Sequence, residues 1–189
     1  RLGLVGLKEA LEGIHRPKVL ADKDFGRARL AFDEALTLQL TMARRRAATA
    51  TLPATPRVSR PGGLLDAFDA RLPFELTKGQ RAVGETIAEE LALEHPMHRL
   101  LQGEVGSGKT VVALRAMLTV VDAGGQAALL APTEVLAQQH FRSICAMLGP
   151  LALGGQLGGA DDATTVTLLT GSMSQSARRK ALLEAASGE

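Results

Sequence analysis

Apolar residues recur every three or four positions along several stretches of the chain, which is the spacing of one face of an α-helix. The strongest stretch begins at about Asp24 and places an apolar stripe on one face, formed by Phe32, Leu36, Leu40, Ala43 and Ala47. The same spacing predicts a short helix before Lys23 and further helices over residues 64–72, 78–93, 110–122, 134–148 and 175–186.

Three short segments between these predicted helices are predicted strands, namely residues 99–102, 126–131 and 165–169, and the second of them is a continuous apolar run. A continuous apolar run of this length is typical of a strand that is buried on both faces of a parallel sheet. Strands that alternate with helices imply right-handed crossovers. The pattern therefore predicts an α/β fold, with a parallel sheet flanked by helices and preceded by a helical segment.

Proline and glycine cluster at residues 49–63 and predict a linker. We expect a helical connection over residues 1–48 and a nucleotide-binding domain over residues 64–189. A second glycine-rich stretch, residues 149–163, predicts a flexible excursion between two of the βα units.

Three consecutive cations, Arg44, Arg45 and Arg46, lie near the predicted end of the long helix. Positive side chains stabilise the C-terminal end of a helix dipole, and this is the interpretation that we favour. The alternative is a contact with the phosphate backbone of a nucleic acid.

The segment Gly103-Glu104-Val105-Gly106-Ser107-Gly108-Lys109-Thr110 fits the phosphate-loop pattern G-x-x-x-x-G-K-[ST] at every position. Gly103, Gly106, Ser107 and Gly108 are expected to turn backbone N–H groups toward a di- or triphosphate. Lys109 would reach the β- and γ-phosphates, and the Thr110 hydroxyl would bind Mg²⁺. A predicted strand precedes the loop and a predicted helix follows it, so the helix N-terminus lies under the phosphates.

Composition narrows the function only a little. The chain has 189 residues, a net charge of +2, 46% hydrophobic residues and 3% aromatic residues, with no Trp and no Tyr. Few aromatic residues argue against recognition of bases by stacking. The single cysteine, Cys145, excludes an internal disulfide, and neither a leader nor an apolar run of about 18 residues is present. We therefore expect a cytoplasmic protein that does not contact a membrane.

Hydrolysis of ATP also needs a carboxylate that positions Mg²⁺ and a group that orients water. Neither Asp33-Glu34, on the long helix, nor Asp161-Asp162, after glycines, follows an apolar strand, so both pairs are poor candidates. The predicted nucleotide-binding domain is therefore incomplete. We expect this chain alone to bind nucleotide weakly and to hydrolyse almost no ATP.

Three motifs together resemble those of superfamily 2 helicases: Phe74–Gln80, the phosphate loop, and Ala131-Pro132-Thr133-Glu134. At finer detail the chain resembles the bacterial RecG family of ATP-dependent DNA helicases. The segments that carry this resemblance are 14–17, 29–34, 72–77, 96–103, 131–134 and 169–172. Translocases of the transcription-repair coupling type have a similar motor and are the nearest alternative, although Arg29-Leu30-Ala31-Phe32-Asp33-Glu34 favours RecG.

The resemblance implies a RecA-like motor that uses ATP and Mg²⁺, acts on branched duplex DNA and works as a monomer. It assigns Gln80 to the adenine, while a capping box with Thr77 is the structural alternative. It assigns Phe74 to the adenine face, with core packing equally plausible. Thr133 would contact a DNA phosphate or simply cap a helix, and Thr170 and Gly171 carry the same two alternatives with weaker support.

Two other classes of function are open from the residues. A small phosphate-loop kinase or GTPase would share Gly103–Thr110, although the Phe74–Gln80 motif argues against it. A fragment that binds DNA or a protein partner without catalysis would show salt-dependent DNA binding that nucleotides do not change.

Overall fold

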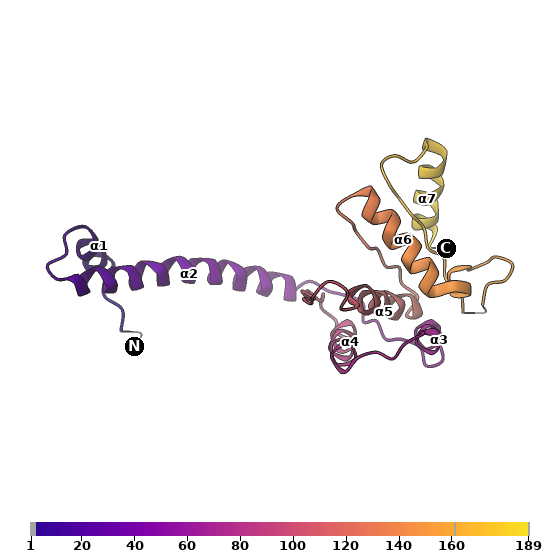
Figure 1. Cartoon of the computed structure of the whole chain (residues 1–189), viewed down its shortest axis with the longest axis horizontal. Helices are drawn as coiled ribbons and strands as arrows, with labels where there is room; N and C mark the ends of the chain where they lie inside the picture. The colour runs from indigo at the N-terminus through magenta and orange to yellow at the C-terminus, as the bar shows by residue number, and fades with distance from the viewer. Residues whose placement is uncertain (1–2, 161, 189) are drawn as a thin grey trace. The chain divides into compact units, whose positions relative to one another are not determined.

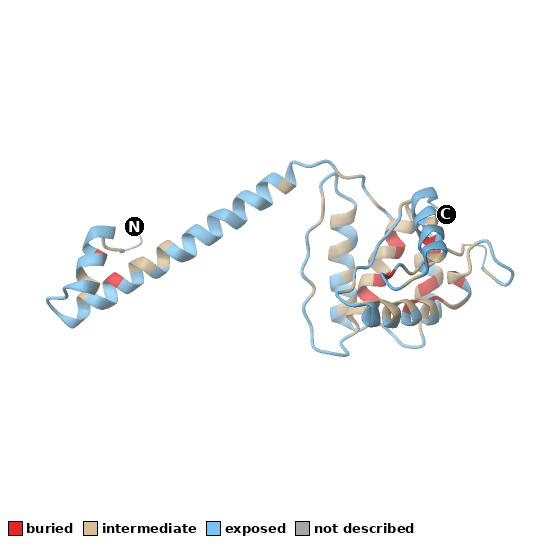
Figure 2. Cartoon of the chain, turned by 90° about the horizontal axis from the view of Figure 1, so that it is seen from above, coloured by how far each residue is buried: buried red, intermediate tan, exposed pale blue. Residues whose placement is uncertain are grey.

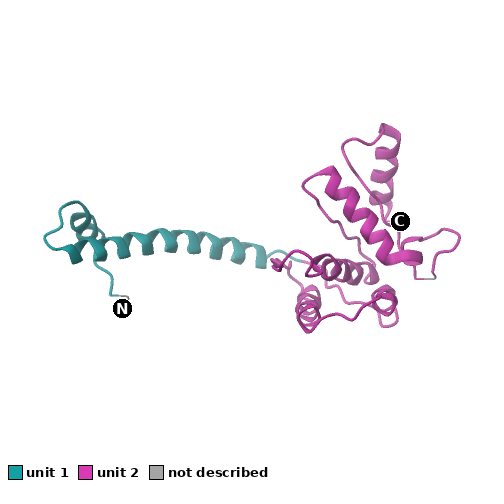
Figure 3. Cartoon of the chain, in the orientation of Figure 1, with its two compact units in different colours: residues 1–53 teal, residues 54–189 magenta. Residues whose placement is uncertain are grey.

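The computed structural model describes residues 3–160 and 162–188 and contains two compact units, residues 1–53 and 54–189 (Figure 3). The first unit is a helical hairpin of α1 (Leu7–His15) and α2 (Leu20–Ala50). The hairpin closes tightly because Gly26 of α2 lies directly against Ala10 of α1, where an added Cβ would lie 2.6 Å from the Ala10 carbonyl oxygen.

The long helix begins four residues earlier than the apolar stripe predicts. The Asp22 carboxylate accepts hydrogen bonds from the backbone N–H groups of Lys18 and Val19 at 2.9 and 3.1 Å, and this cap sets the start of α2. Beyond the contact with α1, most of α2 is exposed within its unit, including Leu36 and Leu40 of the predicted stripe (Figure 2).

The dipole interpretation of Arg44, Arg45 and Arg46 is wrong. The helix continues to Ala50 and has no basic residue in its last turn. Because the dipole effect falls off within the last turn, it cannot account for three arginines that lie before it. Their backbone-contact interpretation stays a prediction.

The second unit contains all the helices that the sequence predicts after the linker. They are α3 (Leu64–Arg71), α4 (Lys78–Leu91), α5 (Lys109–Asp122), α6 (Glu134–Leu148) and α7 (Gln175–Ser187), with a short 3-10 helix η1 (Gly149–Ala152) after α6 (Figure 1). The capping box of α4 is confirmed, since the Thr77 hydroxyl accepts from the Gln80 N–H at 3.2 Å and the Gln80 side chain accepts from the Thr77 N–H at 2.8 Å.

The core of this unit lies around α5. Helices α3 and α4 both pack on α5. Leu114 and Leu118 of α5 are buried in one cluster with Phe68 of α3 and with Leu148 and Leu151 at the end of α6 and in η1. A helix of average length with such a face is stabilised mainly by this tertiary packing rather than by its own propensity.

The three predicted strands do not form a ladder within the part of the chain that the structure describes. Residues 99–102 and 126–131 run without strand pairing, and Thr165 makes only an isolated antiparallel bridge to Leu153. Leu130, in the second of these segments, is 92% exposed, so this structure does not show the burial predicted for residues 126–131. A strand needs a neighbour for its backbone N–H and C=O groups, and none of these three segments lies beside another as a paired strand.

The glycine-rich stretch is better anchored than its composition suggests. Its first four residues form η1, and Leu151 there is buried in the core. The Gly154 N–H donates to the Thr164 carbonyl at 2.9 Å and closes the loop at its base. The predicted linker is anchored as well, since the Ala54 and Arg57 N–H groups donate to carbonyls at the end of α4, those of Glu94 and Leu91.

We predict that Leu118→Ala destabilises the second unit by about 2–5 kcal/mol, because it removes buried methyl groups and leaves a cavity. Leu130→Ala is the matched control in the same unit and should change stability by less than about 0.5 kcal/mol, since its side chain is already in water. Hydrogen exchange of the α5 amides measures both values. Equal effects of the two substitutions would contradict the core described above.

Candidate nucleotide-binding site

The predicted phosphate loop forms a tight turn that leads directly into α5. Gly106 and Gly108 have φ of 83° and 80°, in the left-handed region that favours glycine. Gly108 is the N-cap of α5, and its carbonyl accepts from the N–H groups of Val111 and Val112 at 3.0 and 3.3 Å. The first N–H groups of α5 therefore face the loop, which is the arrangement that binds anions at helix N-termini.

The Lys109 side chain folds back over this loop. Its Nζ donates to the carbonyl oxygens of Gly103 and Glu104 at 2.8 and 2.7 Å. The ammonium group is thus held against the backbone at the start of the loop. A positive charge at this place, beside helical N–H groups, favours a phosphate group.

Gln80 connects α4 to the phosphate loop. Its Nε2 donates to the Ser107 carbonyl at 2.9 Å, while its Oε1 takes part in the capping box. An amide side chain has two donor hydrogens and two acceptor lone pairs, so one donor and one acceptor remain. The capping role is confirmed, and the adenine role stays a prediction.

Thr110 is the second residue of α5 and is half-buried beside Lys109. Mg²⁺ bound with a nucleotide takes one or two protein oxygens together with phosphates and water, so a single hydroxyl suits this ion.

Phe74 borders a cavity of about 810 Å³ that is lined by α3, α4, α5 and the segment between α3 and α4. Its side chain is 49% exposed, so the alternative role in core packing is wrong. Arg81 of α4 supports this segment by donating to the Leu76 carbonyl at 2.9 Å. An exposed aromatic ring on a supported segment leaves a flat apolar face available to a ligand.

Two of the predicted DNA-contact motifs meet where the first turn of α6 contacts residues 171–172. The Glu134 carboxylate, in the first turn of α6, accepts from the Ser172 N–H at 2.8 Å and lies against Gly171. Hydrogen bonds from Ser172, chiefly from its side chain, lower the pKa of the Glu134 carboxyl. The sequence identifies the motif that ends in Glu134, but the hydrogen bond between Glu134 and Ser172 depends on the fold and has no signal in the sequence.

The individual predicted contacts differ in exposure. Thr133 is exposed and caps α6, with its hydroxyl accepting from the Leu136 N–H at 3.3 Å. Gly171 is exposed too, whereas Thr170 is only 8% exposed. The N-cap alternative for Thr133 is therefore confirmed, and the DNA contacts of all three residues stay predictions.

The two acidic pairs are placed as follows. Asp33 accepts two hydrogen bonds from Arg29 Nε at 3.0 and 2.9 Å on α2, so its carboxylate is engaged within the helical hairpin. Asp162 pairs with Arg60, and Asp161 lies outside the described residues. The carboxylates of Asp33 and Asp162 are thus each paired with an arginine that lies outside the phosphate loop.

Comparison with known protein families gives one decisive result. The family model described as DEAD/DEAH box helicase matches residues 77–184, which contain the phosphate loop and both motifs around α6. The chain belongs to the DEAD/DEAH box helicase family. This match, together with the solved structure described below, shows that the chain has a RecA-like helicase fold.

Relatives within this helicase family confirm the resemblance to RecG. The ATP-dependent DNA helicase RecG of Mycobacterium tuberculosis is 51% identical over 99% of this chain, and that of Thermotoga maritima is 42% identical over 74% of it. The chain covers 25% and 18% of those two proteins. A solved structure described as RecG bound to a three-way DNA junction aligns with a TM-score of 0.78 and 34% identity, over 96% of this chain and 23% of that one.

Within the described residues, none of the helices combines the length and the apolar character that a membrane crossing requires.

We predict that Glu134→Gln lowers the thermal stability of the second unit at neutral pH, because it removes the charged acceptor of the Ser172 hydrogen bonds. The folded carboxyl has a pKa below its ordinary value of 4.5, so its contribution is complete above that value and disappears as the pH falls through the lower one. Melting curves between pH 3 and 7 should therefore converge at the acid end.

Glu89→Gln on the exposed face of α4 is the control and should not differ from the unmodified chain at any pH. A difference between Glu134→Gln and the unmodified chain that persisted unchanged at the acid end would contradict the assigned contact.

Proposed function

We propose that this chain carries the nucleotide-binding part of an ATP-dependent DNA helicase that acts on branched DNA. The observation that carries the proposal is the phosphate loop at the N-terminus of α5, with the Lys109 ammonium held over it. Relatives named ATP-dependent DNA helicase RecG, and a related structure described with a three-way DNA junction, support the choice of reaction and of DNA.

Each residue of the loop has a role in this proposal. The backbone N–H groups of Gly106, Ser107 and Gly108 hold the phosphates of ATP, and Lys109 exchanges its two carbonyl contacts for phosphate oxygens. The Thr110 hydroxyl would hold Mg²⁺, and the ion would supply positive charge beside the phosphates.

Adenine recognition is assigned to Gln80 and Phe74. Gln80 keeps one donor and one acceptor beyond its contacts with Thr77 and Ser107, and a paired amide is suited to the donor and acceptor edge of adenine. Phe74 offers its exposed ring for packing against the base. Selection of adenine over guanine would distinguish this site from that of a GTPase.

For the DNA backbone we propose the surface formed by Thr133, Gly171 and the N-terminus of α6. Exposed N–H groups at this helix end suit a phosphate, and the Glu134 charge beside them is partly satisfied by Ser172. Thr170 would need to turn outward to take part, since its side chain is buried.

We further propose that residues 99–102, 126–131 and 165–169 are strands of the parallel sheet of a RecA-like domain and that other parts of the parent protein lie between them. Roughly a third of strands that follow one another in sequence are not neighbours in the sheet, so a strand from elsewhere can supply each missing ladder. Residues 1–48 would connect this motor domain to the preceding region of the parent protein. We propose that the full-length enzyme is monomeric and cytoplasmic.

We predict that Lys109→Ala in the full-length protein lowers ATP hydrolysis at least about a hundredfold, because it removes a charge from the transferring phosphates. Lys8→Ala, which removes an exposed lysine from α1, is the matched control and should retain full activity. Steady-state phosphate release measures both variants.

The chain of residues 1–189 alone should hydrolyse almost no ATP, since a carboxylate for Mg²⁺ and a water-orienting group are also required. Robust hydrolysis by this chain that Lys109→Ala abolishes would show that the catalytic carboxylate lies within it. Salt-dependent DNA binding that ATP does not change, together with no effect of Lys109→Ala, would instead favour a non-enzymatic DNA-binding role.

Leu130→Ala also tests the proposed sheet. In the full-length protein, completed ladders would bury residues 126–131, so the substitution should destabilise the motor domain by about 2–5 kcal/mol. In the chain of residues 1–189 it should be nearly neutral. Hydrogen exchange in both proteins measures the difference, and a neutral effect in both would rule out a buried strand at this position.

A further inference from the structure

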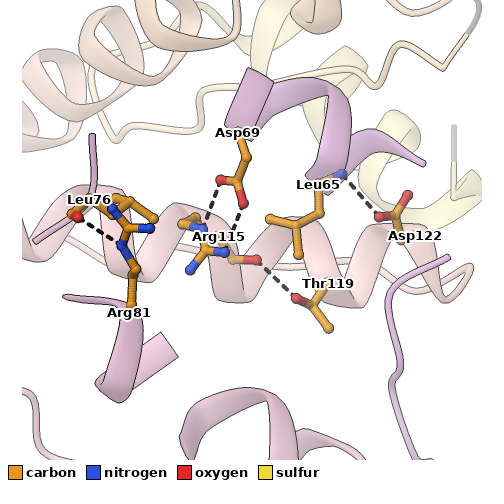
Figure 4. Close-up of polar contacts among 7 residues, drawn as sticks. All are labelled: Leu65, Asp69, Leu76, Arg81, Arg115, Thr119 and Asp122. Carbon is orange, nitrogen blue, oxygen red and sulfur yellow. Dashed lines mark hydrogen bonds and ion pairs between the residues drawn. The ribbon is translucent and has the colours of Figure 1, made fainter. Parts of the chain in front are cut away.

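Helix α3 is attached to the phosphate-loop helix α5 at both of its ends (Figure 4). At its start, the Asp122 carboxylate accepts from the Leu64 and Leu65 N–H groups at 2.7 and 3.0 Å. Near its end, the Asp69 carboxylate accepts two parallel hydrogen bonds from Arg115 Nε and an Arg115 terminal nitrogen, both at 2.8 Å.

These contacts fix the direction and register of the two helices. Asp122 is the last residue of α5 and caps the first residues of α3, so the helices run antiparallel. The buried side chains of Phe68 and Leu118 lie in the same core cluster. A bidentate Arg–carboxylate pair adds angular specificity that a single ion pair lacks.

The Arg115 guanidinium also lies against α4. An added Cβ at Gly84 of α4 would lie 2.6 Å from an Arg115 terminal nitrogen, so a larger residue there would require the Arg115 side chain to shift. The pair with Asp69 prevents Arg115 from moving aside freely, because its side chain is only 20% exposed and that of Asp69 is 32% exposed. Arg115 therefore touches both α3 and α4 while it belongs to α5.

These two helices lie on either side of the segment that we assign to adenine. Phe74 follows Asp69 by five residues, and Gln80 precedes Gly84 by four on α4. The phosphate loop, by contrast, is continuous with α5 itself. The relative position of base and phosphate subsites therefore depends on how α3 and α4 sit on α5.

We propose that Arg115, with Asp69 and Gly84, is a positioning group that sets the adenine segment against the phosphate loop and thereby determines the affinity for the base. The proposal rests on the ATP site proposed above. Arg115 lines the same cavity as Phe74, and in this proposal it acts by holding α3 and α4 in place rather than by contacting the phosphates. Loss of its contacts should weaken binding of ATP and leave binding of an inorganic phosphate chain unchanged.

The test compares ATP with inorganic tripolyphosphate, each with Mg²⁺, by titration calorimetry on the full-length protein. Arg115→Gln removes the bidentate pair, and Gly84→Ala displaces Arg115 without removing any charge. Both variants should raise the Kd for ATP about tenfold, the equivalent of one lost hydrogen-bonded contact, while the Kd for tripolyphosphate changes less than about twofold.

Two control variants accompany them. Lys180→Gln breaks an exposed ion pair on α7 and should change neither Kd. Gly79→Ala adds a methyl group to α4 at a position where the added Cβ would have no atom within 4 Å. Its thermal unfolding measures how much the change from glycine to alanine by itself stabilises α4. If Arg115→Gln does not fold, Gly84→Ala alone tests the positioning role.

The proposal would be overturned if binding of ATP and of tripolyphosphate weakened equally, or if the Kd for ATP did not change in Gly84→Ala. Arg115 would then have a purely structural role. Lys109→Ala separates this result from failure of the ATP site, because it should weaken both ligands. If Lys109→Ala changes neither Kd, the proposed ATP site is refuted and the positioning role falls with it.

Discussion

The second unit depends on the packing of other elements against α5. Burial of Leu114 and Leu118 provides the apolar contact, and the charged contacts of Asp122 and Arg115 give that contact a direction. Apolar packing alone tolerates sliding and rotation, whereas a helix cap and a bidentate pair do not. The same helix carries the phosphate loop at its N-terminus, so the core and the site share one element.

Each of the two proposed sites, for nucleotide and for the DNA backbone, joins segments that are distant in sequence. Gln80 reaches the Ser107 carbonyl across 27 residues, and Glu134 reaches Ser172 across 38. In both cases the first turn of a helix contributes a side chain that contacts a turn elsewhere. Helix starts are suitable for this purpose because their side chains and unpaired N–H groups face the same region of solvent.

The helices could be predicted from the chain because apolar periodicity, caps and breakers are local properties. Thr77 and Gln80 identified the start of α4, and Gly124 and Gly125 identified the end of α5. The strands were predicted from short segments of local sequence, yet a strand is completed only by a neighbour, and Leu130 stays exposed without one. The dipole argument for Arg44 failed because the end of α2 was placed too early.

The sequence by itself determined the helices, the phosphate loop and the family resemblance, because each depends on residues that are close together in the chain. Only the tertiary structure decided that Phe74 is exposed, that Gln80 contacts the loop while it caps α4, and that Arg115 joins three helices. These facts depend on the distance between segments, which residue spacing does not encode. A single arginine among the polar residues of α5 carries no local signal of the carboxylate and the glycine that it contacts.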